Sequence, residues 1–382
     1  MRILQCVGDI DPALGGSVEA ARQLSHALER LGHSAELVTI RQARPEWIAA
    51  WKGAVHYAGP AATRYLYSRY LRRWMDGHAG KFDAVVIHGL WRYTSVGAWR
   101  ALRRGNVPYF VFAHGMLDPY FKTAFRWRHV QKEVCWAAAE SRVIRDATGV
   151  LFACEEERLR ARQTFRPYQC RERIVGLGIA KPTGDAQAQK KAFLAAYPEL
   201  AGTRMVLFLG RIHPKKGCDL LIRAFARVAR GEPRLRLMIA GPDECGWRAK
   251  LEKLAGVCGV GGRVLFPGPL YGDLKWGALH SAEVMALPSH IENFGITVVE
   301  ALACGVPVLI SNGVNIWREI EADGAGLVEP AHLEGVTSLF ERWLRLPESE
   351  RRRIGQCALR SFTSRFELER FGRDFAACVR ME

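Results

Sequence analysis

Short apolar runs alternate with stretches of helical spacing along most of the chain. Residues 3–7 form an apolar run that predicts a buried strand. From Ser17 onward, apolar residues recur at helical spacing as far as Leu31, and Gly32 follows as a helix cap would. Residues 35–40 predict a second strand. A strand, a loop, a helix and a strand in this order begin an open parallel sheet.

The same alternation continues through the first half of the chain and restarts in the second. Further strands are predicted at residues 84–87, 109–113, 149–153 and 173–175, and then at 205–209, 236–240, 264–266, 284–287 and 307–310. Helices are predicted at residues 219–229, 248–258 and 297–303. The fold class is therefore α/β, with two successive doubly wound parallel sheets. Ligands of such sheets bind beyond the carboxyl ends of the strands, so we expect the site in a cleft between the two domains.

Breaks in this pattern predict the domain boundaries. We expect an N-terminal domain at residues 1–178 and a C-terminal domain at residues 193–355. Residues 179–192 read as a linker, because Gly, Pro and Gln interrupt the periodicity there. Residues 356–382 predict terminal helices whose apolar face carries Phe362, Phe366, Phe371 and Phe375.

Composition adds a strong positive charge to this picture. The 382 residues include 55 Lys and Arg against 39 Asp and Glu, a net charge of +16. Residues 1–180 hold 27 basic and 16 acidic side chains, so most of the excess lies in the first half. Such asymmetry indicates an anionic partner: nucleic acid, anionic lipid or a phosphorylated substrate.

Cysteine usage and hydropathy suggest a cytoplasmic protein. The ten cysteines are scattered, with neither a Cys-x-x-Cys pair nor a Cys/His cluster at zinc spacing, which predicts reduced and mostly buried thiols. No apolar run approaches the ~18 residues of a membrane-spanning helix. The first apolar stretch is too short for a signal peptide, and acidic residues follow it too soon.

The strongest chemical signal lies at residues 288–308. A strand end leads into a loop with Glu292 and Gly295, then a helix with Glu300, then Gly305-x-Pro307. The start of a helix offers free N–H groups and a positive dipole end, which suit a phosphate. A plain strand-loop-helix with two solvated acids would read the same way.

Three further signals follow predicted strands. Gly210 allows a tight turn, and Arg211 and Lys216 place positive charge after it. Gly15-Gly16 stands at the first strand-to-helix turn, and His114 ends another strand. Neither Gly-x-Gly-x-x-Gly at this turn nor a phosphate-binding Gly-x-x-x-x-Gly-Lys-Ser/Thr occurs, which disfavours a dinucleotide dehydrogenase and a P-loop NTPase.

Taken in order, these motifs resemble a bacterial family-4 retaining glycosyltransferase (group 1) of the GT-B fold. The resemblance covers nearly the whole chain and rests on Gly15-Gly16, His114-Gly115, Gly210-Arg211 with Lys216, Gly241-Pro242, and Pro288-Ser289 through Glu292-x7-Glu300. It implies two Rossmann-like domains facing a central cleft, with the nucleotide-sugar held mainly by the C-terminal domain. It also implies that the last helix crosses back onto the N-terminal domain.

The resemblance implies a role for each matching residue. Arg211 and Lys216 would neutralise the diphosphate, and Glu300 would bind the ribose hydroxyls. Glu292 would contact the donor sugar, and His114 would lie against it. The implied catalytic residues are His114, Arg211, Lys216 and Glu292; the implied donor-binding residues are Gly15, Gly16, Gly210, Arg211, Lys216, Gly241, Pro242, Glu292, Asn293, Phe294, Gly295, Ile296, Thr297 and Glu300.

The activity implied is retaining transfer of a sugar from a nucleotide-diphosphate sugar to a glycan or lipid-linked acceptor, in cell-surface polysaccharide or glycolipid synthesis. No cofactor and no metal are expected, and Asp9-x-Asp11 is not interpreted as a metal site. Two positions depart from the family pattern. The more general family motif has Gly after the first Glu, where this chain has Asn293, and this version of the motif is similar to that of exopolysaccharide-type members. Residues 177–180 replace an Asn-Gly-Ile/Val-Asp loop.

Other partners and activities stay open. Residues 64–74 and 121–128 interleave basic and aromatic side chains. They suit either an anionic membrane surface, with the protein peripheral on the inner face of the plasma membrane, or core aromatics under a solvated basic face. A nucleic-acid-binding protein and a same-fold nucleotide-sugar epimerase or hydrolase are the alternatives to transfer, although no nucleic acid is expected. The base, sugar and acceptor are not determined.

Overall fold

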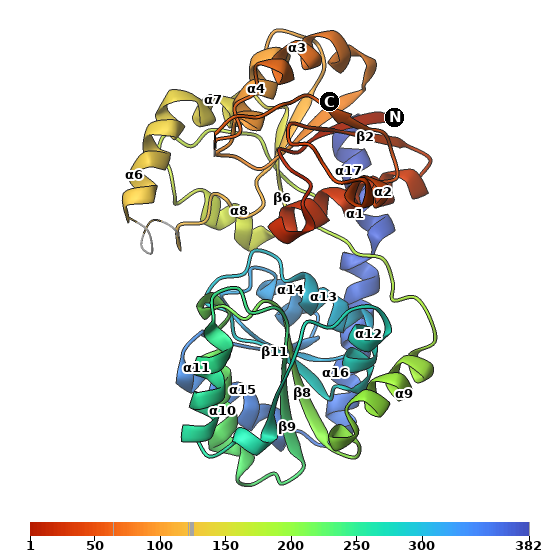
Figure 1. Cartoon of the computed structure of the whole chain (residues 1–382), viewed down its shortest axis with the longest axis vertical. Coiled ribbons are helices and arrows are strands. Elements are labelled where there is room, and N and C mark those ends of the chain that lie inside the picture. Colours follow the sequence, from red (N-terminus) through yellow and green to blue (C-terminus); the bar gives the residue numbers. More distant parts are fainter. Residues whose placement is uncertain (64, 121, 123–125, 382) are drawn as a thin grey trace. The chain divides into compact units, whose positions relative to one another are not determined.

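The computed structural model describes residues 1–63, 65–120, 122 and 126–381 (Figure 1). It divides into two compact units, one formed by Met1–Ala180 with Phe366–Glu382 and the other by Lys181–Arg365. Each unit contains one parallel sheet with helices packed on it, so the predicted α/β class is confirmed.

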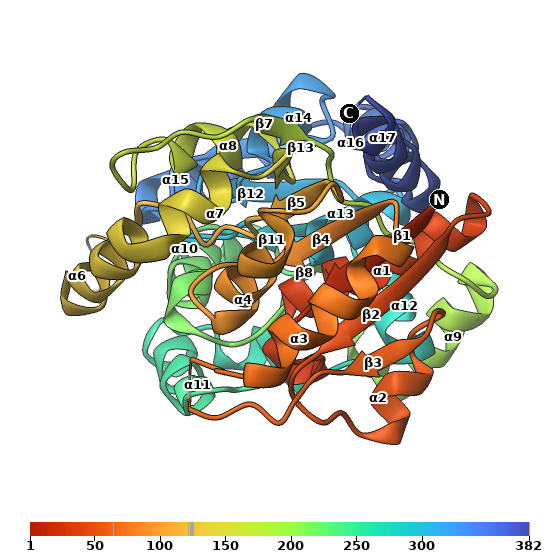
Figure 2. The ribbon, with the colours of Figure 1, turned by 90° about the horizontal axis from the view of Figure 1, so that it is seen from above.

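The first unit is built on a seven-stranded sheet in the order β3-β2-β1-β4-β5-β6-β7, which Figure 2 shows from β3 at one edge to β7 at the other. Every pair of neighbouring strands is parallel. The strands are β1 (Arg2–Cys6), β2 (Ser34–Thr39), β3 (Val55–Tyr57), β4 (Ala84–His88), β5 (Tyr109–Phe112), β6 (Gly149–Phe152) and β7 (Glu172–Ile174). The helices are α1 (Gly16–Arg30), α2 (Pro45–Ala49), α3 (Arg69–His78), α4 (Tyr93–Leu102), α6 (Arg126–Cys135), η3 (Trp136–Glu140), α7 (Ser141–Arg145), α8 (Glu155–Ala161) and α17 (Leu368–Arg380).

Both faces of this sheet are covered, which explains why its strands read as continuous apolar runs. Tyr109 and Val111 of β5 join the core formed with α3 and α4. Phe110 and Phe112 point to the other face, where their rings meet Phe375 and Phe371 of α17 at 6.3 and 6.4 Å. In Figure 1 α17, the last helix of the chain, lies beside α1 of the same unit.

The second unit holds a six-stranded sheet in the order β10-β9-β8-β11-β12-β13, again parallel between all neighbours. Its strands are β8 (Arg204–Leu209), β9 (Leu235–Ala240), β10 (Val264–Gly268), β11 (Val284–Leu287), β12 (Val308–Ser311) and β13 (Gly326–Glu329). Its helices are α9 (Ala186–Ala196), α10 (Cys218–Ala229), α11 (Trp247–Val257), α12 (Gly272–Ser281), α13 (Ile296–Ala303), α14 (Trp317–Ala322), α15 (Leu333–Arg345) and α16 (Glu348–Ser361).

The linker predicted at residues 179–192 is shorter in the structure. Asp185 accepts hydrogen bonds from the N–H groups of Gln187 and Ala188 and so caps α9, which packs on α12. At the other end, residue Phe366 begins the segment that belongs to the first unit. Both the N–H and the carbonyl of Ile179 form hydrogen bonds to this segment, and the N–H donates to the carbonyl of Phe366.

The hydrophobic pattern did not predict two short strands. Strand β3 has three residues and lies at one edge of the first sheet, and β13 lies at one edge of the second sheet. Both are partly exposed rather than continuously apolar, so their sequences lack the signal of a buried strand. All ten cysteines are free; only five of them are buried, fewer than the predicted majority, and Cys135 and Cys245 are exposed. Over the described residues, no helix combines the length and the apolar character needed to cross a membrane.

Candidate functional site

The predicted donor residues gather at the carboxyl ends of the strands in the second unit. Gly210 follows β8, Gly241 follows β9, and the loop with Glu292 follows β11. In a parallel sheet these ends share one edge, which is where ligands of open α/β sheets bind. The sequence placed them in separate motifs, and the order β9-β8-β11 makes their strands direct neighbours.

The ends of β8 and β9 approach each other very closely. A Cβ atom at Gly241 would lie 1.8 Å from the carbonyl oxygen of Gly210, so only glycine fits. The N–H of Gly210 donates to the carbonyl of Ala240 at 3.0 Å, and that of Ile212 donates to Pro242 at 2.8 Å. These bonds hold Arg211 between two fixed backbone positions.

A second close approach fixes Lys216 beside the β11 loop. Gly217 adopts a left-handed φ of 66°, and a Cβ atom there would lie 2.2 Å from the carbonyl oxygen of Pro288. The N–H of His290 donates to the carbonyl of Lys215 at 2.8 Å. The loop after β8 is therefore bonded directly to the loop after β11.

Two ion pairs engage the predicted cations at this edge. Lys216 Nζ contacts Glu292 Oε2 directly, and only 14% of the lysine side chain is exposed. Burial and the nearby Arg211 lower the pKa of Lys216 to about 8, while the adjoining carboxylate favours the ammonium form, so Lys216 carries its charge at neutral pH. Arg211 is half exposed and pairs with Glu244 at 2.9 Å.

The loop after β11 is held by backbone bonds on both sides of Glu292. Its N–H donates to Gly313 and its carbonyl accepts from Asn315, at 2.8 and 2.9 Å. Gly295, at φ 80°, turns the chain into α13, and Phe294 is buried below. Because α13 begins at Ile296, the first N–H groups of this helix, including Thr297, lack intrahelical acceptors and form the positive end of its dipole.

Glu300 lies further along α13 and is engaged by a residue that the sequence did not single out. Lys275 Nζ of α12 donates to Glu300 Oε1 at 2.8 Å, and it also lies 4.2 Å from the centre of the Trp276 ring. The Glu300 side chain is 14% exposed. Each of the four predicted charged residues at this edge therefore has an ionic partner, in three pairs: Lys216 with Glu292, Arg211 with Glu244, and Glu300 with Lys275.

The predicted residues of the first unit also follow strand ends. Gly15 adopts φ 81° as the N-cap of α1, and Gly16 is the first residue of that helix. A Cβ atom at either would meet nothing within 4 Å, so internal packing does not require glycine at position 16. Asp9 is buried and accepts hydrogen bonds from the N–H of Asp11 and from Arg41, which makes it part of the loop framework.

His114 has a strained backbone and a buried partner. Its φ of 50° is uncommon for a residue other than glycine, and such positions concentrate at functional sites. Its Nε2 lies 2.9 Å from Nδ1 of His88, and its ring stacks on Phe112 at 4.4 Å. Burial lowers the pKa of His114 to about 3, so its imidazole is neutral.

Three residues at these sites were missed by the sequence interpretation: Glu244, Lys275 and His88. Each belongs to an ordinary strand end, loop or helix, and its importance depends on a neighbour distant in sequence. Only His88, a histidine at the end of an otherwise apolar strand, carried a local signal.

The basic-aromatic segments prove different from each other. In α3, Leu71 and Met75 are buried while Arg72 and Arg73 are exposed, so core side chains lie under a solvated basic face there. In α6, Trp127, Val130 and Val134 are 87%, 51% and 65% exposed. Arg64 of the first segment and residues 121 and 123–125 of the second lie outside the described residues.

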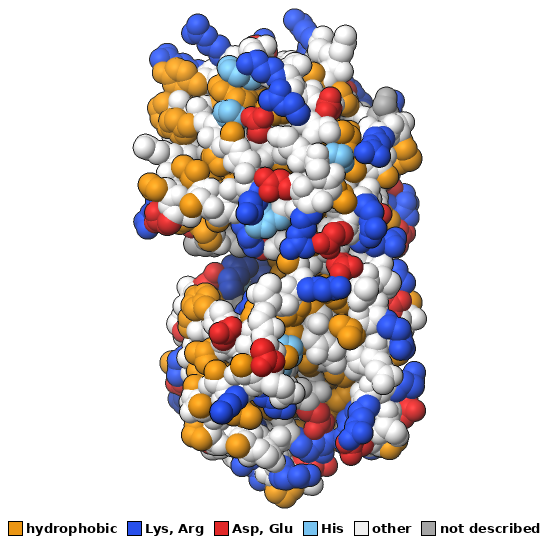
Figure 3. Space-filling view, turned by 90° about the vertical axis from the view of Figure 1, so that its right-hand side faces the viewer, with side chains coloured by type: hydrophobic (Ala, Val, Ile, Leu, Met, Phe, Trp, Pro, Cys, Tyr) orange, Lys and Arg blue, Asp and Glu red, His pale blue; other side chains and the backbone are white. Residues whose placement is uncertain are grey.

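On the face seen in Figure 3 positive charge is not concentrated, because Lys and Arg side chains are interspersed with acidic and neutral ones.

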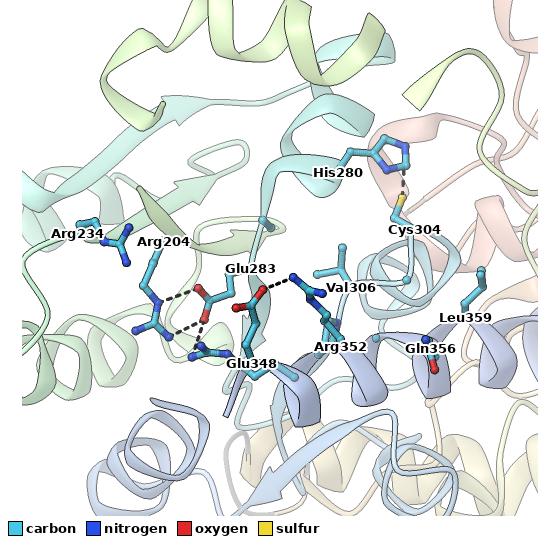
Figure 4. Close-up of a pocket in the computed structure, with 15 residues that line it drawn as sticks. Arg204, Arg234, His280, Glu283, Cys304, Val306, Glu348, Arg352, Gln356 and Leu359 are labelled. Carbon is cyan, nitrogen blue, oxygen red and sulfur yellow. Dashed lines mark hydrogen bonds and ion pairs between the residues drawn. The ribbon is translucent and has the colours of Figure 1, made fainter. Parts of the chain in front are cut away.

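A cavity of about 710 Å³ in the second unit is rich in arginine (Figure 4). Its residues Arg204 and Glu283 stand at the amino ends of β8 and β11, the edge opposite to the predicted donor residues. Arg204 binds Glu283 through two hydrogen bonds of 2.8 Å, so its charge is already compensated.

Metal ligands do not cluster in the described residues, where no group of three His, Cys, Asp or Glu side chains could hold an ion together.

Comparison with known families matches both halves of the chain. Residues 189–359 match the model of glycosyl transferases group 1, and residues 15–178 match that of the glycosyl transferase 4-like domain. D-inositol 3-phosphate glycosyltransferases are similar in sequence. The protein of Streptomyces bingchenggensis is 28% identical over 68% of this chain and 58% of its own length, and that of Nocardia farcinica is 30% identical over 66% and 56%. The chain thus spans less than three fifths of these relatives.

Solved structures share the whole fold. HepE of Anabaena, in complex with UDP, has a TM-score of 0.81 at 16% identity and is covered over 100% of both chains. Sucrose-phosphate synthase of Thermosynechococcus elongatus has a TM-score of 0.76 at 20% identity, over 100% of this chain and 98% of its own. Together with the two parallel sheets, these likenesses confirm the predicted GT-B fold with two Rossmann-like domains.

Proposed function

This chain belongs to the group 1 glycosyltransferases with a glycosyl transferase 4-like N-terminal half, and we propose that it transfers a sugar from a nucleoside-diphosphate sugar to an acceptor hydroxyl. One observation carries the proposal: Lys216, Arg211 and the N-terminus of α13 converge at the carboxyl edge of one sheet. That convergence supplies fixed positive charge at a place where α/β sheets bind ligands.

The diphosphate is the part of the donor that these groups suit best. Arg211 offers paired hydrogen bonds to phosphate oxygens, and Lys216 offers a compact charge that little solvent can screen. In this proposal the phosphates replace the carboxylates of Glu244 and Glu292 as partners of the two cations. Glu292 then turns to the sugar hydroxyls, and Glu300 to the ribose.

The chemical step in this proposal is departure of the nucleoside diphosphate. The bond between the anomeric carbon and the phosphate oxygen breaks, the acceptor oxygen bonds to that carbon, and the leaving phosphate accepts the acceptor's proton. Arg211, Lys216 and the dipole of α13 stabilise the negative charge on the leaving group, and such prearranged stabilisation is usually the largest contribution to catalysis.

We propose further that transfer retains the anomeric configuration and needs no divalent metal. Attack on the face from which the diphosphate leaves would give an α-linked product from an α-linked donor. A proton NMR coupling typical of the β anomer in the product would contradict retention. Transfer that is unchanged by EDTA is expected, because side chains and a helix dipole supply the positive charge; strict dependence on Mn²⁺ would refute this part.

The acceptor is proposed to be a glycan or lipid-linked sugar of exopolysaccharide or glycolipid synthesis. The relatives favour a second candidate, because their names give D-inositol 3-phosphate as the molecule that they glycosylate. The two candidates are separated by offering each acceptor with the same donor: transfer to inositol phosphate alone would replace the polymer acceptor. Release of free sugar or an epimerised donor without any acceptor would instead indicate a hydrolase or epimerase.

Helix α6 supports peripheral binding to an anionic membrane, which would place the protein on the inner face of the plasma membrane. Trp127, Val130 and Val134 are spaced so that they share one face of the helix, and all three are exposed. The first half of the chain also carries the greater excess of positive charge. We expect the protein to sediment with phosphatidylglycerol vesicles at low salt and not with phosphatidylcholine vesicles. Equal sedimentation of a variant with serine at all three positions would contradict this role of α6.

Thermal stability in the presence of nucleotides tests the donor site first. UDP, GDP and ADP would be added to the wild-type protein, to Arg211→Ala and to Arg353→Ala, with and without EDTA. Arg353 is a matched control because it also forms an exposed 2.9 Å ion pair, with Glu350. A ligand at 100 times its dissociation constant stabilises by about 2.7 kcal/mol.

The expected result is stabilisation by one nucleotide in the wild type and the Arg353 variant, with loss in the Arg211 variant. If no nucleotide stabilises the wild type, the donor site is wrong. Salt-dependent binding to oligonucleotides would then favour the nucleic-acid alternative.

A further inference from the structure

Four polar side chains form one continuous chain of hydrogen bonds inside the first unit. Gln5 Nε2 of β1 donates to Ser25 Oγ of α1 at 2.6 Å. Gln5 Oε1 lies 2.8 Å from His88 Nε2, at the end of β4. His88 Nδ1 lies 2.9 Å from His114 Nε2, just beyond β5. The exposed fractions of Gln5, Ser25 and His88 are 0%, 1% and 7%, so these side chains bond to one another and not to bulk solvent.

The direction of these bonds sets the protonation of both histidines. Because the Gln5 amide nitrogen is used by Ser25, its oxygen faces His88 and requires a proton on His88 Nε2. Burial and the neighbouring His114 lower the pKa of His88 well below its ordinary value, so the ring is neutral and Nδ1 is bare. A bare Nδ1 accepts, which requires the proton of His114 to sit on Nε2.

The remaining nitrogen of His114 is then an acceptor. Within the described part of the chain, His114 Nδ1 has no hydrogen-bond partner, and the side chain is only partly buried. The ring cannot rotate freely, because Phe112 stacks against it with an angle of 2° between the planes. The backbone is fixed as well: Glu157 accepts from the N–H of Gly115 at 2.5 Å and from that of Ala153 at 2.7 Å.

We propose that His88, held by Gln5 and Ser25, is a positioning residue that locks His114 in the Nε2–H tautomer and so presents its Nδ1 as an acceptor for a sugar hydroxyl. The sugar as ligand rests on the proposed function, whereas the tautomer lock does not. A sugar hydroxyl would donate its proton to this nitrogen and so be held in one orientation, whereas a proton on Nδ1 would reverse the hydrogen bond and make the hydroxyl its acceptor. The strained φ of His114 is consistent with a side chain aimed for binding.

Nitrogen NMR of the histidine side chains tests the lock without any assay of activity. The full-length protein would carry ¹⁵N-histidine, and the His114 signals would be assigned by their loss in His114→Gln. We expect a protonated Nε2 and a bare Nδ1 for His114 at neutral pH and down to about pH 5. A protonated Nδ1 in the wild type would overturn the proposed order of bonds.

A double variant provides the matching perturbation. Gln5→Leu with His88→Phe removes both buried polar partners together, which avoids leaving one unsatisfied. Ser25 can then bond within its own helix. His114 should now show both tautomers, while its pKa stays low, because burial lowers that pKa and the two apolar replacements keep the ring buried. An unchanged Nε2–H tautomer in this variant would overturn the role of His88, and the single variant His88→Gln checks that a polar side chain of similar reach restores part of the effect.

Kinetics separate positioning from mere folding. The variant should keep its affinity for whichever of UDP, GDP and ADP binds the wild type, because neither Gln5 nor His88 is among the predicted donor-binding residues. Its kcat with the matching nucleotide sugar should fall roughly 10- to 100-fold, the usual loss when a residue that orients another is removed. If the double variant shows both tautomers of His114 and yet keeps the kcat of the wild type, the proposed contact between His114 and the sugar is overturned. If the wild type transfers no sugar at all, the proposed function fails while the NMR result still decides the lock.

Discussion

Replacing Gly241 by alanine is the sharpest perturbation of the predicted donor site. The new Cβ would lie 1.8 Å from the carbonyl oxygen and 2.6 Å from the carbonyl carbon of Gly210. Both atoms are backbone and belong to a neighbouring strand end, so no side chain can rotate away. The strand ends must separate by more than 1 Å to reach an ordinary contact, and the φ of 151° at Gly241 is itself one that alanine rarely adopts.

The expected destabilisation follows from these two effects. Overpacking of this kind costs about 1–3 kcal/mol, and an unfavourable backbone conformation costs about 1–3 kcal/mol more. We therefore expect a loss of about 3 kcal/mol, which corresponds to a fall in Tm of roughly 6–12 °C for a unit of this size. Because the Gly210 and Ile212 N–H bonds flank Arg211, the same shift should weaken nucleotide binding even in molecules that remain folded.

The assay combines thermal unfolding with titration of the nucleotide that stabilises the wild type. Gly256→Ala is the matched control, since Gly256 lies within α11 and a Cβ atom there meets nothing within 4 Å. Its stability should be unchanged or slightly higher, because alanine favours a helix. A Gly241→Ala protein with the Tm and the nucleotide affinity of the wild type would refute the close approach of β8 and β9 and its role in placing Arg211.

Three further predictions concern single side chains. Lys216→Ala should lower turnover about 100-fold or more, because it removes the least solvated positive charge at the proposed diphosphate site, and near-normal turnover in a folded variant would defeat that assignment. Gly16→Ala should leave Tm unchanged yet weaken donor binding, whereas Gly77→Ala, at an equally open helical position, should change neither; equal binding by both would remove Gly16 from the site. Burial raises the pKa of Glu140 to about 7, so the folded state holds its proton more tightly than the unfolded chain and the free energy of unfolding should fall between pH 4.5 and 7. Glu140→Gln should remove that fall and gain about 2 kcal/mol at pH 8, and denaturant unfolding of both proteins at pH 5 and pH 8 would show whether the difference depends on pH as stated.

Local patterns were sufficient for most of the sheet. Strands such as β4 and β11 are buried on both faces and read as uninterrupted apolar runs, so their positions were predicted to within a residue or two. The edge strands β3 and β13 were missed because half-exposed positions carry no such run. The linker was drawn too long because residues 186–192, all exposed except Gln189, form the start of α9, which Asp185 caps.

The candidate site divides in the same way. Glycines and charged residues directly after strands could be named from the sequence, because a strand end followed by such residues is a local signal. Glu244 and Lys275 could not be named, and His88 was missed although it ends an apolar strand, because each matters through a partner between 25 and 33 positions away. Nothing in the spacing of the chain says which of many charged residues will face another.

The sequence by itself determined the class of the fold, the family and the residues at the strand ends, because these depend on periodicity and on short motifs. Only the tertiary structure decided which charges are paired, which glycines are irreplaceable and which nitrogen of His114 is free to accept a hydrogen bond. The physical reason is that pairing, steric contact and the direction of a buried hydrogen bond are properties of distances between segments, and the strand order that brings those segments together is not written in any one of them.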